Sequence, residues 1–210
     1  MKQRTRVKIC GITRTDDALA AAAMGVDAIG LVFYERSPRN VETEQAAAIC
    51  RQLPAFVTTV ALFLDADQAF VHEVLSKVQI DLLQFHGTED PAYCESFDKP
   101  YIKALGMGSF NLDGLISQSN AYKNARGLLL DSHEHGASGG TGETFDWNSI
   151  PVMNKPLILA GGLTVSNVAA AVSRVHPWAV DVSSGVEANK GIKSVELMSA
   201  FMQEVENANR

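Results

Sequence analysis

Eight apolar, β-branched runs, each followed by a helical pattern or its remnant, predict an α/β protein with a parallel eight-stranded sheet. The chain has 210 residues, which is at the low end for such a sheet closed into a barrel. Neither a linker nor a shift in composition divides it. We therefore predict a single (β/α)₈ TIM barrel in which residues 1–210 form one domain.

The predicted strands are short and almost wholly apolar, as expected for strands that are covered on both faces. They are expected at residues 6–10, 27–33, 57–63, 82–86, 101–105, 127–131, 157–160 and 178–182.

The predicted helices lie between these strands. In the first, Thr15 offers an N-cap, Asp16 and Asp17 an acidic first turn, and Gly25 a stop after the alanine-rich run. The helices are expected at residues 15–24, 44–53, 69–78, 91–97, 112–119, 165–174 and 194–205, with only a stub near Trp147 after the sixth strand.

Right-handed crossovers allow either a closed barrel or an open doubly wound sheet. An open flavodoxin-like sheet needs only about five β–α units. Eight units in so few residues favour the closed barrel.

Composition narrows the class of protein further. Hydrophobic residues make up 46% and charged residues 20%, which is the balance of an ordinary globular protein. The formal charge of -6 argues against a general nucleic-acid binder. No apolar run approaches the ~18 residues needed to cross a bilayer, and the apolar stretch after the basic N-terminus is too short for a signal peptide. Cys10, Cys50 and Cys94 are odd in number and far apart, so neither disulfides nor a zinc site is expected. We predict a cytoplasmic protein.

A (β/α)₈ barrel places its active site at the C-terminal ends of its strands. The seventh strand leads into Gly161 and Gly162, and the eighth into Ser183, Ser184 and Gly185. Glycines let backbone N–H groups approach an anion, and these two loops bind phosphate in many barrels. Either loop alone would be read as a tight turn, but together they predict a phosphate site.

Cys10 ends the first strand and Asp131 ends the sixth. A lone cysteine is usually a buried structural residue, which we expect of Cys50 and Cys94. Cys10 should instead point toward the barrel mouth, and an unpaired carboxylate at Asp131 would be costly in a core. The two are therefore candidates for a catalytic base and acid.

Arg39 follows the second strand and is a candidate clamp for a substrate carboxylate, although an isolated arginine in a polar turn is more often merely exposed. His86 and Asp181 are expected either to shape the site or to make structural hydrogen bonds. The remaining histidines lack metal-ligand spacing, so no metal or other cofactor is expected.

Residues 136–144 are rich in glycine but do not form a nucleotide loop, because Glu143 follows Gly142 where a P-loop has lysine. We expect this segment to act as a lid over the site.

Seven motifs, in order, resemble those of phosphoribosylanthranilate isomerases over nearly the whole chain. They lie at residues 7–13, 33–39, 83–87, 129–131, 139–147, 160–163 and 180–187. The resemblance implies a cofactor-free isomerase of tryptophan biosynthesis that carries out an Amadori rearrangement of N-(5-phosphoribosyl)anthranilate.

The resemblance also implies the roles of the site residues. Asp131 would protonate the furanose ring oxygen and open the ring to a Schiff base, and Cys10, as a thiolate, would remove the proton from sugar C2. The phosphate loops and Arg39 would hold the two ends of the substrate between them.

Three alternatives stay open. The related Amadori isomerase of histidine synthesis is expected to use a pair of aspartates, and Cys10 takes the place of the first. A non-catalytic sensor would keep the phosphate loops but lose the acid or the base, and a purely structural barrel would need neither. The expected partner is a small-molecule substrate, without nucleic acid or membrane, and the chain is expected to be a monomer or homodimer.

Overall fold

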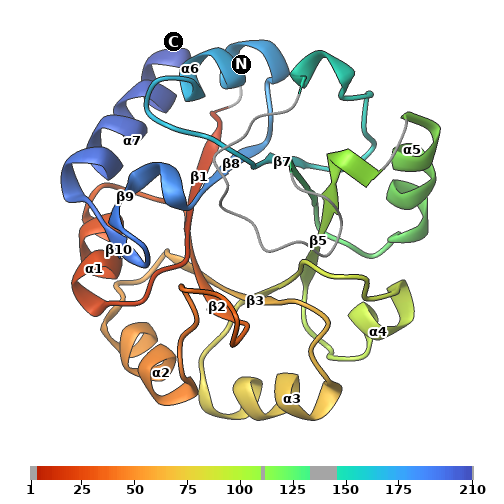
Figure 1. Cartoon of the computed structure of the whole chain (residues 1–210). Helices are drawn as coiled ribbons and strands as arrows, with labels where there is room; N and C mark the ends of the chain where they lie inside the picture. Colours follow the sequence, from red (N-terminus) through yellow and green to blue (C-terminus); the bar gives the residue numbers. More distant parts are fainter. Residues whose placement is uncertain (1–3, 110–111, 133–145, 210) are drawn as a thin grey trace.

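The computed structural model describes residues 4–109, 112–132 and 146–209. Eight parallel strands form a closed barrel in the order β1 to β8, with helices outside it (Figure 1). The strands are β1 (Arg6–Cys10), β2 (Ala28–Phe33), β3 (Thr58–Phe63), β4 (Leu82–Phe85), β5 (Tyr101–Gly106), β6 (Leu128–Asp131), β7 (Leu157–Leu159) and β8 (Ala179–Val182). The predicted (β/α)₈ barrel is confirmed, and the open doubly wound sheet is excluded.

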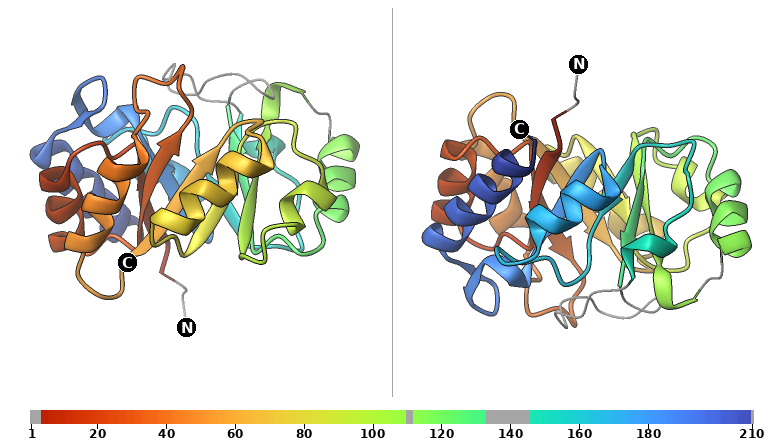
Figure 2. Two further views of the ribbon diagram at one scale, coloured as in Figure 1. Left: turned by 90° about the horizontal axis from the view of Figure 1, so that it is seen from below. Right: turned by 90° about the horizontal axis from the view of Figure 1, so that it is seen from above.

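The barrel closes where β1 pairs with β8. Val7 lies opposite Val180 and Lys8 opposite Asp181 in this parallel pair. The chain ends meet near the same seam, because the Thr5 backbone N–H donates to Asn209 Oδ1 over 3.0 Å. The side views show the helices as an outer layer around the strands (Figure 2).

Helices follow most strands, as predicted. They are α1 (Thr15–Ala23), α2 (Thr43–Gln52), α3 (Gln68–Lys77), α4 (Pro91–Glu95), α5 (Leu112–Ala121), α6 (Val168–Val175) and α7 (Val195–Asn209). Between β6 and β7, the described residues form only a 3₁₀ turn at Trp147–Ser149, which matches the predicted stub.

Two local predictions were wrong. The helix expected from residue 165 begins at Val168. Asn167 instead stabilises the preceding turn, because its side chain accepts from Thr164 N and donates to Gly162 O. A small antiparallel pair, β9 (Glu187–Asn189) and β10 (Ile192–Lys193), was not expected between β8 and the last helix.

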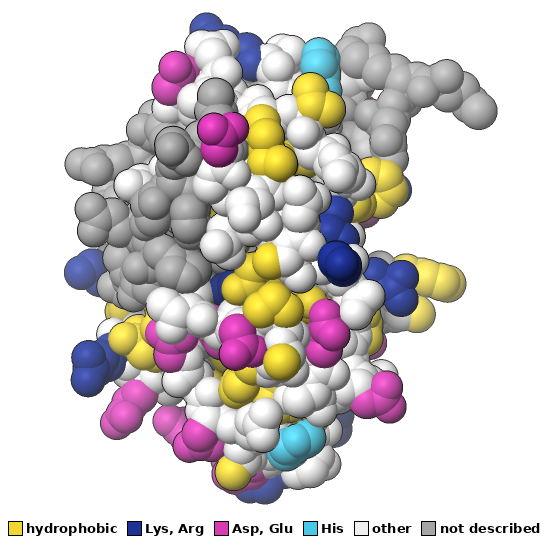
Figure 3. All heavy atoms as spheres, turned by 90° about the vertical axis from the view of Figure 1, so that its right-hand side faces the viewer, with side chains coloured by type: hydrophobic (Ala, Val, Ile, Leu, Met, Phe, Trp, Pro, Cys, Tyr) yellow, Lys and Arg dark blue, Asp and Glu magenta, His cyan; other side chains and the backbone are white. Residues whose placement is uncertain are grey.

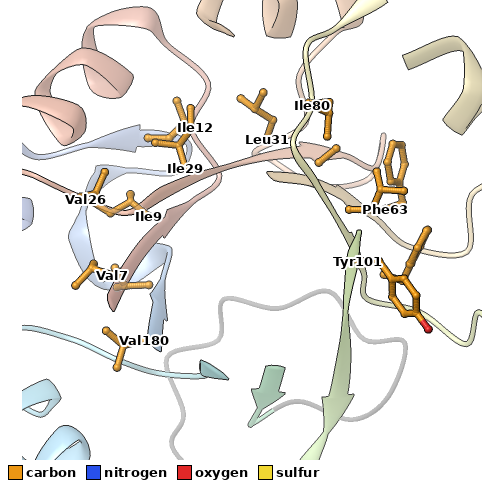
Figure 4. Packing of buried hydrophobic residues seen from close by; sticks show 14 of the residues in the cluster. Val7, Ile9, Ile12, Val26, Ile29, Leu31, Phe63, Ile80, Tyr101 and Val180 are labelled. Carbon is orange, nitrogen blue, oxygen red and sulfur yellow. The ribbon is translucent and has the colours of Figure 1, made fainter. Parts of the chain in front are cut away.

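Side chains alternate between the two faces of the barrel wall. Val7 and Ile9 of β1 point outward into the main hydrophobic core between strands and helices, where Ile29 and Val180 also lie (Figure 4). Lys8 and Cys10 therefore point into the barrel, because successive residues of a strand face opposite sides. The interior holds a second apolar cluster that includes Ile102, Leu129 and Ile158.

The molecular surface mixes charges of both signs with apolar side chains, as seen on the side where α4 and α5 lie (Figure 3). Among the described residues, none of the helices is both long enough and apolar enough to cross a membrane.

The aromatic contacts around Phe63 make it a test of the outer core. Phe63 is fully buried and stacks on Phe33 with ring centroids 5.4 Å apart, whereas Phe56, in the turn before β3, is fully exposed. We expect Phe63→Ala to lower the free energy of unfolding by about 3–5 kcal/mol because it leaves a cavity, and Phe56→Ala to change it by less than about 0.5 kcal/mol. Urea denaturation measures both, and equal losses in the two variants would contradict this description of the core.

Candidate active site

A cavity of about 300 Å³ opens at the C-terminal ends of the strands. Its walls include nine of the ten residues predicted for the site, all except Gly185, which packs just behind them. The nine are Cys10, Arg39, His86, Asp131, Gly161, Gly162, Asp181, Ser183 and Ser184. Residues from six strands and their loops thus meet in one pocket, although they are up to 174 positions apart in the chain.

Cys10 ends β1 with its thiol in the cavity wall and only 5% of its surface exposed. Gly11, with φ of +73°, turns the chain directly after it, and a Cβ there would lie 2.5 Å from Arg39 Cδ. Glycine at this position therefore lets Arg39 lie beside the end of β1. Burial raises the pKa of the Cys10 thiol, while the positive charge of Lys8 opposes this shift.

Asp131 ends β6 and is also largely buried. His86 Nε2 lies 3.6 Å from Asp131 Oδ2, and Gln84 Nε2 lies 3.1 Å from His86 Nδ1. His86 therefore lies between Gln84 and the candidate acid.

The two glycine loops lie against one another. Gly161 and Gly162 have φ of +83° and +62°, a left-handed conformation that favours glycine. A Cβ on Gly185 would lie 1.9 Å from the carbonyl oxygen of Leu163, so the loop after β8 contacts the backbone of the loop after β7. Asn167 holds the first loop through its hydrogen bonds to Gly162 and Thr164.

Arg39 is held more firmly than the sequence suggested. It is buried, its Nε donates to Glu187 Oε1 (2.7 Å), and its Nη2 donates to Glu187 Oε2 (2.8 Å). Lys193 Nζ donates both to Glu187 Oε1 and to the carbonyl oxygen of Ser183. Burial raises the pKa of Glu187, but the hydrogen bond from Arg39 and the charge of Lys193 outweigh it and lower this pKa below its usual value.

This arrangement bears on the predicted role of Arg39. Two of its N–H groups engage Glu187, so a clamp on a substrate carboxylate would use the rest of the guanidinium group, which presents five N–H donors in total. Asp181 likewise has a partner, because Lys8 Nζ donates to its Oδ1 over 2.9 Å inside the barrel.

Sequence reasoning missed Lys8, Gln84, Glu187 and Lys193. The alternation along β1 and β4 could have revealed Lys8 and Gln84, since each lies two residues from a predicted site residue and so on the same face of its strand. Glu187 and Lys193 lie in the unexpected β9–β10 pair, for which the sequence offered no clear signal. The predicted lid at residues 136–144 lies outside the described residues, so its role stays a prediction.

A closed (β/α)₈ barrel with one cavity at the C-terminal ends of its strands, lined by a thiol, a carboxyl group and two glycine loops, is typical of enzymes that act on small molecules. The family model described as "N-(5'phosphoribosyl)anthranilate (PRA) isomerase" matches residues 7–204. The chain belongs to this family.

Individual relatives agree with the family match. An N-(5'-phosphoribosyl)anthranilate isomerase from Pseudomonas fluorescens (strain SBW25) is 56% identical over 205 residues, which cover 97% of each chain. The crystal structure of the isomerase from Thermus thermophilus is 32% identical, with a TM-score of 0.84, and the match covers 97% of this chain and 99% of that one. A further isomerase structure, 35% identical with a TM-score of 0.81 and the same coverage, is described as a complex with reduced 1-(o-carboxyphenylamino)-1-deoxyribulose 5-phosphate.

The contact between the two glycine loops gives a test of the predicted phosphate site. Gly185→Ala should weaken the binding of inorganic phosphate by about tenfold or more, because the new Cβ forces the loops apart. Tenfold corresponds to a loss of ~1.4 kcal/mol of binding free energy. Gly25→Ala is the control for a new Cβ that meets no other atom: Gly25 has φ of +79°, but a Cβ there has nothing within 4 Å. Isothermal titration calorimetry measures both, and wild-type affinity in Gly185→Ala would contradict the assignment.

Proposed function

We propose that this chain converts N-(5'-phosphoribosyl)anthranilate into its aminoketose isomer, with Asp131 as general acid and Cys10 as general base. The observation that supports these roles is that both side chains line one cavity together with the loops after β7 and β8. β1 and β6 are three places apart around the barrel, so the acid and the base approach a bound substrate from different sides.

The first step is opening of the sugar ring. Asp131 gives its proton to the furanose ring oxygen, the bond between C1 and that oxygen breaks, and the anilino nitrogen forms a Schiff base with C1. The acid must hold its proton until the substrate binds. Asp131 is only 8% exposed and lines the cavity, so its carboxyl group would face the bound sugar directly.

The second step moves a proton from carbon. The Cys10 thiolate removes the proton from C2, whose electrons flow toward the Schiff-base nitrogen and give an enolamine. The enolamine then tautomerises to the ketone by taking up a proton at C1. Substrate and product are isomers, so the reaction needs no external oxidant, reductant or cofactor.

Binding groups at the two ends of the cavity would hold the reacting carbons between acid and base. We assign the phosphate to Gly161, Gly162, Ser183, Ser184 and Gly185, whose loops meet beside the cavity. Arg39 would bind the anthranilate carboxylate with the part of its guanidinium group that Glu187 leaves available. Fixing both ends makes the proton transfers effectively intramolecular, which accelerates them.

His86 and Asp181 complete the proposed site without an acid–base step of their own. His86 presents Nε2 toward Asp131 and would orient its carboxyl group, with Gln84 holding the ring. Asp181 lines the cavity but forms an ion pair with Lys8, so we assign it a structural role in the cavity wall near Cys10.

We further propose that residues 1–210 form one domain that works in the cytoplasm as a monomer or homodimer. The continuous β1–β8 seam, which joins the two ends of the chain, supports one domain. The three cysteines are all unpaired, as is usual in a reducing compartment.

Cys10→Ser and Asp131→Asn test the proposed acid and base. Each should lower kcat at least about 100-fold, since a general acid or base contributes 10²–10⁴-fold, and should leave KM nearly unchanged. The measurement follows the decay of anthranilate fluorescence after the substrate is generated in situ. Cys50→Ser is the control, because Cys50 lies in α2, outside the cavity.

Two outcomes would contradict this proposal. Retained turnover in either variant would remove that residue from its role. Absence of turnover in the folded wild type would redirect the search to other phosphorylated aminoaldoses, beginning with that of histidine synthesis.

A further inference from the structure

Lys8 is a buried cation that has no role in the proposed reaction. It is 5% exposed, points into the barrel from β1, and lies below the cavity without lining it. Its ammonium group forms an ion pair with Asp181, directly opposite on β8. Such a pair is a poor source of stability, because removing both charges from water costs about as much as their attraction returns. Its presence beneath the site points to a role in the site.

Gly30 of β2 shows how close Lys8 lies to Cys10. A Cβ on Gly30 would be 2.8 Å from Cys10 Sγ and 3.0 Å from Lys8 Nζ. Both atoms thus lie next to the same point on β2, no more than about 6 Å from each other. An opposite charge within about 4–6 Å favours the ionised form of a neighbouring group. The missing side chain of Gly30 leaves room for this approach.

The charges around Cys10 come from three elements. Burial raises the pKa of the Cys10 thiol, Lys8 on β1 lowers it, Asp181 on β8 raises it, and Lys193 on β10 lowers it. Of the three charged residues, Lys8 has the largest effect. Lys8 itself stays protonated: burial lowers its pKa, but Asp181 and Cys10 together raise it above the usual value.

We propose that Lys8 is a positioning residue that stabilises the thiolate of Cys10, with Asp181 and the gap at Gly30 holding its ammonium group in place. Lys8 donates no proton and touches no substrate; it acts on the reaction only through Cys10. Its importance for turnover rests on the proposed role of Cys10 as the base, whereas its effect on the thiol does not depend on that role.

The direct test is the pH dependence of Cys10 alkylation by iodoacetamide, followed by peptide mass spectrometry. Rates are measured between about pH 6 and 10.5. Below the pKa of the thiol the rate is proportional to the fraction of thiolate, so a higher pKa appears as a lower rate at fixed pH even where the midpoint lies above this range. The variants are Lys8→Met, which removes the charge at similar length, and Lys8→Arg, which keeps it. Lys77→Met is the control, because Lys77 is half-exposed and pairs with Glu73 on the surface of α3.

We expect the midpoint of the alkylation profile to rise by about 1–3 pH units in Lys8→Met, which appears as a fall of about 10- to 1000-fold in the alkylation rate at a fixed pH below the midpoint. Lys8→Arg should stay near the wild type, and Lys77→Met should equal it. An unchanged midpoint in Lys8→Met, or an equal rise in Lys8→Arg, would overturn the proposal, because either result would show that the charge has no influence on the thiol.

A second variant separates charge from folding. Lys8→Met leaves the Asp181 carboxyl group buried without its partner, so Lys8→Met/Asp181→Asn removes both charges and keeps the interior neutral. The midpoint in the double variant should also lie above that of the wild type, since Lys8 acts on Cys10 more strongly than Asp181 does. A midpoint at the wild-type value would overturn the proposal. Loss of folding would instead appear as rapid alkylation of Cys94, which is fully buried in the native protein.

Kinetics then connect the thiol to turnover. In Lys8→Met, kcat should fall about tenfold or more at neutral pH with little change in KM. The acidic limb of the kcat/KM profile should also move to higher pH, because the base must be deprotonated to act. If the alkylation profile shifts but the acidic limb of the kcat/KM profile does not, Cys10 is not the base. That result would contradict the proposed function, but not the effect of Lys8 on the thiol.

Discussion

Pairing of β1 with β8 is the interaction on which the rest of the structure depends. It closes the sheet into a barrel and brings Lys8 against Asp181, 173 positions away in the chain. An open sheet would leave the ends of β1 and β6 on opposite sides of the molecule, with no common cavity between Cys10 and Asp131. Closure therefore creates both the fold and the place in which the proposed acid and base face one substrate.

Several charged side chains are buried where apolar side chains would pack well. Three groups of them are paired: Lys8 with Asp181 inside the barrel, Arg39 and Lys193 with Glu187 in the loops after β2 and β8, and Lys103 with Glu89. The first two groups lie at the proposed site, because Lys8 is beside Cys10 and Lys193 donates to the carbonyl oxygen of Ser183. Charge pairing therefore helps to arrange the site.

Local patterns were enough to predict most of the fold. The apolar strands and the helix signals are properties of neighbouring residues, and the rule that parallel strands end at one face placed Cys10, Asp131 and both glycine loops together. The same rule could not show that Arg39 would form an ion pair with Glu187, since that pair depends on the β9–β10 turn, which packs against the loops after β1 and β2. The start of α6 was missed for a similar reason, because Asn167 forms hydrogen bonds with the loop before it instead of continuing the helix.

The sequence by itself determined the order of strands and helices, the closed barrel and which residues end each strand, because periodicity and helix signals act over a few residues. Only the tertiary structure decided which buried groups became partners, as with Lys8 and Asp181 or His86 and Asp131. Electrostatic and hydrogen-bonding contacts depend on distances of a few ångströms between distant segments, and the barrel sets those distances only when it closes.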